Sequence, residues 1–92
     1  MEKELTNHNL QTVKLHIGCG THLKEGYYNI DQYVSAPGIL TMDIFNLEFE
    51  TDSVDEIFTE HMLEHLGKYE VPLALKEWAR VLKPDGKLVM NL

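Results

Sequence analysis

The feature that most constrains the fold of this chain is one amphipathic helix between two short apolar segments. Apolar residues recur at spacings of three and four along residues 70–83, which predicts a helix with one continuous apolar stripe. Pro84 ends this pattern, because a proline cannot continue a helix. Segments rich in β-forming residues lie on either side, at residues 54–59 and 87–92. A helix that joins two strands in this way predicts a right-handed crossover between parallel strands.

Three further short strands are expected before this unit, at residues 13–17, 27–31 and 39–44. The order of the elements predicts an α/β fold with a mainly parallel sheet. A chain of 92 residues has room for one compact domain, which we place at residues 13–92. Residues 1–12 are polar and unpatterned, so we expect a flexible N-terminal arm there. Because no element follows the fifth strand to cover it, we expect the domain to be incomplete at its C-terminus.

The charge balance limits the kinds of partner that the chain can bind. Eight Lys and Arg against 15 Asp and Glu give a net charge of −7, which argues against binding to nucleic acids or anionic membranes. No apolar run approaches the roughly 20 residues that span a bilayer, and the N-terminus lacks the features of a signal peptide. The single cysteine, Cys19, cannot form an internal disulfide. These features predict a cytoplasmic protein.

Glycines and carboxylates fall at the ends of the first three expected strands. A Gly-Cys-Gly sequence at residues 18–20 follows the first strand, where glycines let the backbone approach a ligand closely. Asp31 ends the second strand, and a carboxylate there can accept hydrogen bonds from both hydroxyls of a ribose. Asp43 ends the third strand, where it could bind the exocyclic amine of an adenine with Ile44 against the ring. Each of these residues alone is also typical of a tight turn.

Two histidines, His61 and His65, flank Glu64 after the fourth expected strand. Two histidines four residues apart on a helix can share a metal, and His-x-x-Glu-His is the pattern of inverted zinc peptidases. A third ligand would have to be a downstream acid, since no histidine follows His65. A position after the fourth strand also explains these residues without metal, as side chains that face a substrate or that hydrogen-bond to each other or to Glu64. We therefore predict no metal site, and a zinc hydrolase is kept as an alternative function.

Several sequence blocks occur in a characteristic order. They are LHIGCG at 15–20, NID at 29–31, Asp43, SVDEI at 53–57, HMLEHL at 61–66 and RVLKPDGKL at 80–88. Together they resemble class I S-adenosylmethionine-dependent methyltransferases, most closely the methyltransferase domain 11 type of small bacterial enzymes. The resemblance covers residues 14–92 and is most specific at 55–66 and 80–88. It implies a Rossmann-like sheet flanked by helices, of which this apparently truncated chain holds the first five of seven strands.

The resemblance also implies roles for individual residues in binding S-adenosylmethionine. The methionine part would lie over Gly18, Cys19 and Gly20. Asp31 would hold the ribose hydroxyls, while Asp43 and Ile44 would flank the adenine. Glu60 and His61 would border the methionine end of the cofactor and the substrate opening.

The chain departs from the family pattern at three places near the glycines. His16 stands where an acid is common, two residues before the first glycine. His22 stands where a third glycine is common. The first helix is unusually short, because residues 21–26 hold at most one helical turn.

The leading hypothesis is an enzyme, or part of one, that transfers the methyl group of S-adenosylmethionine to a small-molecule or surface-borne acceptor. The sequence does not identify this acceptor. If a general base is needed, His61 or His65 is the best candidate, because neutral imidazole is available near pH 7. The alternative is a non-catalytic adenosyl-binding or self-associating fragment of such an enzyme. We also expect the uncovered edge at residues 87–92 to pair with a second copy, which would give a homo-oligomer.

Overall fold

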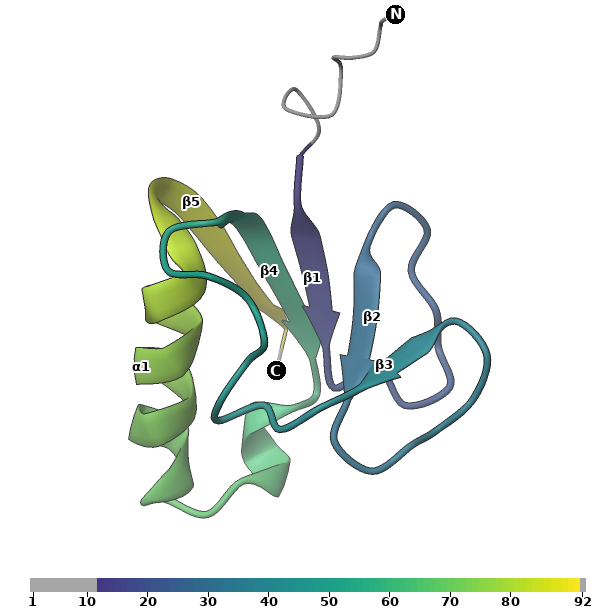
Figure 1. Cartoon of the computed structure of the whole chain (residues 1–92). Coiled ribbons are helices and arrows are strands. Elements are labelled where there is room, and N and C mark those ends of the chain that lie inside the picture. Colours follow the sequence, from purple (N-terminus) through teal and green to yellow (C-terminus); the bar gives the residue numbers. More distant parts are fainter. Residues whose placement is uncertain (1–11, 92) are drawn as a thin grey trace, which may run out of the picture.

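The computed structural model describes residues 12–91, which form one sheet of parallel strands with a helix against one face (Figure 1). The strands are β1 (Lys14–Ile17), β2 (Tyr28–Asp31), β3 (Ile39–Thr41), β4 (Val54–Glu60) and β5 (Leu82–Asn91). A short 3-10 helix, η2 (Leu63–His65), and the helix α1 (Glu70–Val81) lie between β4 and β5. The predicted α/β fold with a parallel sheet is confirmed. The predicted arm lies outside the described residues, apart from Thr12.

The strand order places one edge of the sheet where ligands bind in α/β proteins. The order is β3-β2-β1-β4-β5, and every neighbouring pair is parallel. The chain therefore proceeds outward from β1 to β3 and then continues on the other side of β1 with β4. Such a reversal of strand order opens a crevice at the carboxyl ends of the strands. The segments that follow β1, β2 and β4 all lie at this edge.

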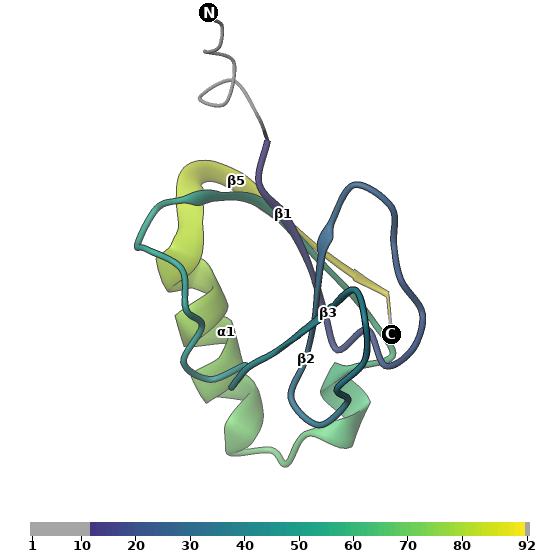
Figure 2. The same ribbon diagram turned by 45° about the vertical axis from the view of Figure 1, so that its right-hand side comes forward.

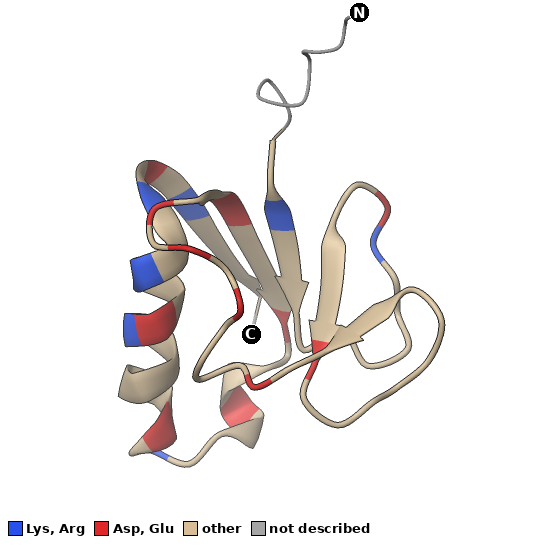
Figure 3. Ribbon diagram, in the orientation of Figure 1, with Lys and Arg blue, Asp and Glu red and all other residues tan. Residues whose placement is uncertain are grey.

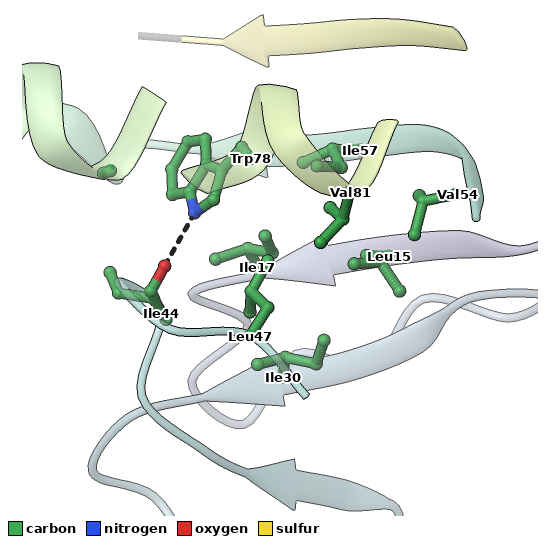
Figure 4. Close-up of a cluster of buried hydrophobic side chains, with 10 residues drawn as sticks. Leu15, Ile17, Ile30, Ile44, Leu47, Val54, Ile57, Trp78 and Val81 are labelled. Atoms are coloured by element: carbon green, nitrogen blue, oxygen red, sulfur yellow. Dashed lines mark hydrogen bonds between the residues drawn. The ribbon is translucent and has the colours of Figure 1, made fainter. Parts of the chain in front are cut away.

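The core lies between the sheet and α1, as Figure 4 shows. The apolar stripe of α1 buries Ala74, Trp78 and Val81, as its sequence periodicity predicts. From the sheet, the buried side chains on this face are Leu15, Ile17, Ile30, Val54 and Ile57. Among residues 12–91, no helix is long and apolar enough to cross a membrane.

The junction between α1 and β5 differs from the expected one. The sequence predicted a helix to residue 83, a turn at residues 84–86 and a strand from residue 87, whereas α1 ends at Val81 and β5 begins at once with Leu82. Val54 pairs with Leu82 and Glu56 pairs with Lys87, so two steps along β4 match five steps along β5. The three extra residues form a bulge in β5 that contains the predicted turn.

The opposite face of the sheet is covered by a loop. Residues 18–27 join β1 to β2 without a helix, and they lie on the other side of the sheet from α1 (Figure 2). The Lys24 ammonium lies 5.1 Å from the ring centroid of Tyr27 and 4.5 Å from that of Phe58 on β4. The Tyr27 hydroxyl donates a hydrogen bond to Glu56, which raises the pKa of Tyr27 to about 12. Cation–π contacts and this hydrogen bond thus hold the loop against the sheet.

Candidate functional site

A cavity of about 320 Å³ opens at the carboxyl ends of β1, β2 and β4. Ligand cavities typically measure about 300–1,000 Å³, so this volume is at the lower end of that range. Six of the residues singled out in the sequence line it, namely Gly18, Gly20, Asp31, Ile44, His61 and His65.

A second cavity of about 400 Å³ adjoins the first. The two cavities share Gly18 and His61 as lining residues. The second one is also lined by Cys19 and Glu60, which the family resemblance places at the methionine end of a cofactor, and by His16 and His22. The two cavities thus meet at Gly18 and His61, and the second one is lined by three histidines and one glutamate.

The two glycines of the loop after β1 have different surroundings. Both have a left-handed backbone, with φ of +76° at Gly18 and +57° at Gly20, which favours glycine. A Cβ at Gly18 would overlap the Sδ atom of Met62, so the Met62 side chain would have to move to admit one. A Cβ at Gly20 would meet nothing within 4 Å and would project into open space beside the first cavity. Gly20 therefore leaves room that a bound molecule can use.

Asp31 joins the loop after β1 to the loop after β2. One carboxylate oxygen accepts a hydrogen bond from the N–H of Gly20 at 2.8 Å, and the other accepts from the N–H groups of Tyr33 and Val34 at 2.9 and 3.0 Å. Burial alone would raise the pKa of Asp31, but these backbone hydrogen bonds outweigh it and hold the pKa below its usual value. Asp31 is thus an ionised carboxylate in the wall of the first cavity.

The main chain of Ile44 is held from both sides. Its N–H donates to the side-chain oxygen of Gln32 at 3.3 Å, and its carbonyl accepts from the indole N–H of Trp78 at 3.0 Å. Asp43, by contrast, is exposed and does not line either cavity, and its carboxylate accepts a hydrogen bond from the N–H of Phe45 at 2.8 Å. The structure therefore brings Ile44 to the cavity and leaves the Asp43 carboxylate in a turn.

The loop that carries Ile44 is also fastened to the outer face of α1. The Glu77 carboxylate accepts a hydrogen bond from the N–H of Leu47 at 2.7 Å. The Arg80 guanidinium donates to the carbonyls of Leu47 and Phe49, both at 3.1 Å, and pairs with Glu77. Figure 3 shows charged residues of both signs on α1 and acidic residues along the loop that precedes β4. The position of Ile44 thus depends on three side chains of α1.

The two histidines do not lie together on one helix. His61 directly follows β4 with a φ of +53°, a left-handed backbone that is uncommon for a residue with a side chain, whereas His65 ends η2. Both side chains are exposed and line the first cavity, and the Nδ1 atom of His61 lies 3.5 Å from a carboxylate oxygen of Glu64. Within residues 12–91, no group of three or more His, Cys, Asp or Glu residues is arranged to hold a metal ion. This geometry does not match the helical metal-binding motif of a zinc peptidase.

The thiol of Cys19 is buried, although Cys19 lies in the glycine loop. Burial raises the pKa of this thiol, and the nearby negative charge of Asp31 raises it further. A thiol with a raised pKa is a poor nucleophile, so Cys19 serves here as a small side chain in a tight loop.

The first cavity is also lined by residues that the sequence analysis did not identify as candidates. They are Gln32, Tyr33, Phe45, Met62, Leu66 and Glu70. The spacing of apolar residues in residues 61–66 could have indicated that Met62 and Leu66 form an apolar wall of this cavity. Tyr33 and Phe45 lie in loops whose course depends on tertiary contacts, and the sequence carried no signal for them.

A family model described as "Methyltransferase domain" matches residues 24–90, well over half of the chain. The chain belongs to this methyltransferase family. The resemblance to class I methyltransferases is thereby confirmed. The match begins after the glycine loop, so the place of Gly18 and Gly20 in this methyltransferase domain rests on the structure alone.

The fold of this methyltransferase domain also occurs among solved structures. One match lies in the complex between the Haloferax volcanii Trm112 methyltransferase activator and its partner methyltransferase, with a TM-score of 0.60 and 20% sequence identity. The aligned part covers 85% of this chain and 43% of that chain, so the domain spans less than half the length of the protein that it matches. No significant match is found among curated proteins.

Proposed function

We propose that this methyltransferase domain binds S-adenosylmethionine across the two adjoining cavities and uses it for methyl transfer. The adenosine would occupy the first cavity, with its ribose at Asp31 and its adenine against Ile44. The amino-acid end would reach the second cavity, past Gly18 toward Glu60. The observation that carries this proposal is the convergence of Gly20, Asp31 and Ile44 on one cavity.

The residues present fit such a cofactor. The open space at Gly20 admits a ligand close to the main chain, and Asp31 offers an ionised carboxylate to hydroxyl donors. The half-buried Phe45 offers an apolar surface for a flat ring, and Ile44, which is only 1% exposed, is part of the same cavity wall. A polar group for the ribose and an apolar wall for the base are what an adenosine requires.

The sulfonium of S-adenosylmethionine supplies an already electrophilic methyl group when it is bound. The protein therefore has mainly to hold an acceptor in line with that group. His61 lines both cavities and His65 lines the first, and in this proposal one of the two imidazoles takes the proton that the acceptor loses as it gains the methyl group.

Replacing Asp31 by alanine should weaken the binding of S-adenosylhomocysteine, the product form of the cofactor. A hydrogen bond to a charged group is worth about 1.5–3 kcal/mol, so we expect roughly a 10- to 150-fold increase in Kd by calorimetry. Asp85→Ala is the matched control, because Asp85 is an exposed acid in the bulge of β5 and lines neither cavity. Equal affinities for the two variants would contradict the assignment of Asp31. Absence of binding by the unmodified protein at millimolar ligand would contradict the proposed function itself.

Self-association through β5 stays a prediction. β5 is the last strand at one side of the described sheet, and Met90 on it is exposed. Leu88, in contrast, packs against the core. A substitution at Leu88 would therefore disturb folding as well as the edge, and Met90→Lys is the better variant. Sedimentation at micromolar concentration should give an assembly that Met90→Lys disperses, and a monomer in both proteins would refute this prediction.

A further inference from the structure

A further cavity of about 500 Å³ lies between α1 and the loop that precedes β4, and we call it the outer cavity. One residue of the loop and four residues of α1 line it, namely Phe45, Leu73, Lys76, Glu77 and Arg80. Its volume is within the range of about 300–1,000 Å³ that is typical of ligand cavities. Within the described part of the chain, Phe45 is the one residue that lines both the outer cavity and the first cavity. The outer cavity is therefore a separate space that has one wall residue in common with the proposed cofactor site.

Glu77 and Arg80 form a part of this wall that needs no ligand. The Glu77 carboxylate accepts hydrogen bonds from the N–H of Leu47 at 2.7 Å and from the Nε atom of Arg80 at 2.9 Å. The guanidinium also donates to the carbonyls of Leu47 and Phe49 and to the hydroxyl of Thr51, each at 3.1 Å. Its hydrogen bonds hold the pKa of Glu77 below the usual value, so both groups are ionised and their charges cancel. This pair fixes the loop on α1 and adds no net charge to the outer cavity.

The other three lining residues combine an apolar surface with one positive charge. Leu73 is 59% exposed although it is a large apolar residue, and Phe45 is half-buried. Lys76 is exposed, and among residues 12–91 no hydrogen bond or ion pair involves its ammonium group. A lysine offers an apolar stem and a mobile charged end, so Lys76 can extend the apolar surface and still pair with an anion. The matching ligand has an apolar ring and one negative charge.

We propose that the outer cavity binds a small aromatic carboxylate, and that its occupation strengthens binding of the cofactor in the first cavity. The ring would pack on Phe45 and Leu73, and the carboxylate would pair with the Lys76 ammonium. A ligand that packs on Phe45 from the outer cavity restricts this side chain before the cofactor arrives, so less conformational entropy is lost when the cofactor binds. The site itself goes beyond the proposed function, whereas the coupling between the two cavities rests on it.

The first test asks whether the site exists, and it uses 3-phenylpropionate as the probe and 3-phenylpropylamine as its cationic counterpart. Titration of ¹⁵N-labelled protein with the carboxylate at millimolar concentration should give saturable changes in the amide chemical shifts of Phe45, Leu73 and Lys76. The amine should bind more weakly, because Lys76 repels it. Equal binding of the two probes, or no saturable change with the carboxylate, would overturn the proposal. Changes confined to Gly20 and Asp31 would also overturn it, because they would place the probe in the first cavity.

A pair of lysine variants tests the role of the charge. Lys76→Met keeps an apolar stem and removes the ammonium group, so it should bind 3-phenylpropionate about two- to fivefold more weakly, as expected for one exposed ion pair. Lys68→Met is the matched control, because Lys68 is an exposed lysine that lines none of these cavities. The control should bind the probe as the unmodified protein does. An equal loss of affinity in both variants would refute a specific pairing with Lys76.

The second test measures the coupling by calorimetry with S-adenosylhomocysteine. Saturating 3-phenylpropionate should lower the Kd of the unmodified protein for S-adenosylhomocysteine about fivefold, at the lower end of typical couplings between sites. Linkage then requires S-adenosylhomocysteine to lower the Kd for the probe by the same factor. An unchanged or higher Kd would overturn the proposed coupling and leave the proposed function in place. A protein that binds the probe and not S-adenosylhomocysteine would overturn the proposed function and support the outer cavity as a ligand site.

Discussion

Replacing Trp78 by alanine should lower the free energy of unfolding by about 3–5 kcal/mol, the range for removal of a large aromatic side chain from a core. Trp78 is fully buried at the centre of the apolar stripe of α1. Its removal would leave a cavity and would also deprive the carbonyl of Ile44 of its hydrogen-bond donor. Domains of this kind have a net stability of about 5–15 kcal/mol, so the variant would lose a large share of it. Denaturant unfolding measures the change.

Two further substitutions in α1 help to separate the contributions to this loss of stability. Trp78→Phe keeps one aromatic ring but removes the donor and part of the buried indole, so it should cost less than Trp78→Ala and at least about 1–3 kcal/mol, the penalty for one unsatisfied buried acceptor. Leu73→Ala changes an apolar residue of the same helix that is 59% exposed, and it should cost within about 0.5 kcal/mol. A Trp78→Ala protein as stable as Leu73→Ala would show that the described core is wrong.

Gly18→Ala should destabilise the protein and alter the proposed cofactor site. A side chain in the left-handed region costs roughly 1–2 kcal/mol, and the new methyl group would also push aside the flexible end of the Met62 side chain, which adds a smaller cost. Because Met62 lines the first cavity, its displacement should also weaken binding of S-adenosylhomocysteine. Unfolding and calorimetry measure the two effects separately.

Gly20→Ala is the matched control for the clash. It shares the left-handed backbone, but its methyl group would meet only open space. We expect it to lose less stability than Gly18→Ala and yet to bind the ligand more weakly, because the methyl group occupies space at the cavity. Adding Met62→Ala to Gly18→Ala should restore affinity for the ligand by removing the clash. If Gly18→Ala and Gly20→Ala lost equal stability, the packing of Met62 on Gly18 would be refuted.

The spacing of apolar residues along the sequence was enough to predict the helix and the strands whose buried side chains recur at regular intervals. The helix α1 is indicated by apolar residues at spacings of three and four, and Pro84 marks its end to within a few residues. The strands around Leu15 and Ile57 are short and rich in β-forming residues, and both lie in the core as expected. The sequence placed Gly20 and Asp31 after neighbouring parallel strands, and the structure joins them by a hydrogen bond, whereas Asp43, which the sequence placed in the same way, lies apart from both cavities.

Features set by tertiary contacts could not be predicted. The bulge in β5 depends on its pairing with β4, which a turn-forming Pro-Asp-Gly sequence cannot reveal. The histidines His61 and His65 have helical spacing, but the left-handed backbone of His61 keeps them off one helical face. The amide of Asn29 meets His16 across two strands, and neither residue type suggests such a pair in the sequence.

We propose that the adjoining cavities at the carboxyl ends of β1, β2 and β4 bind S-adenosylmethionine. Titration of ¹⁵N-labelled protein with S-adenosylhomocysteine, followed by amide chemical shifts, tests it most directly. We predict saturable changes in the amide chemical shifts of Gly18, Gly20, Asp31 and Tyr33, because these residues line the cavity proposed for the adenosine. Shifts confined to β3 or β5, or no shifts at millimolar ligand, would contradict the claim.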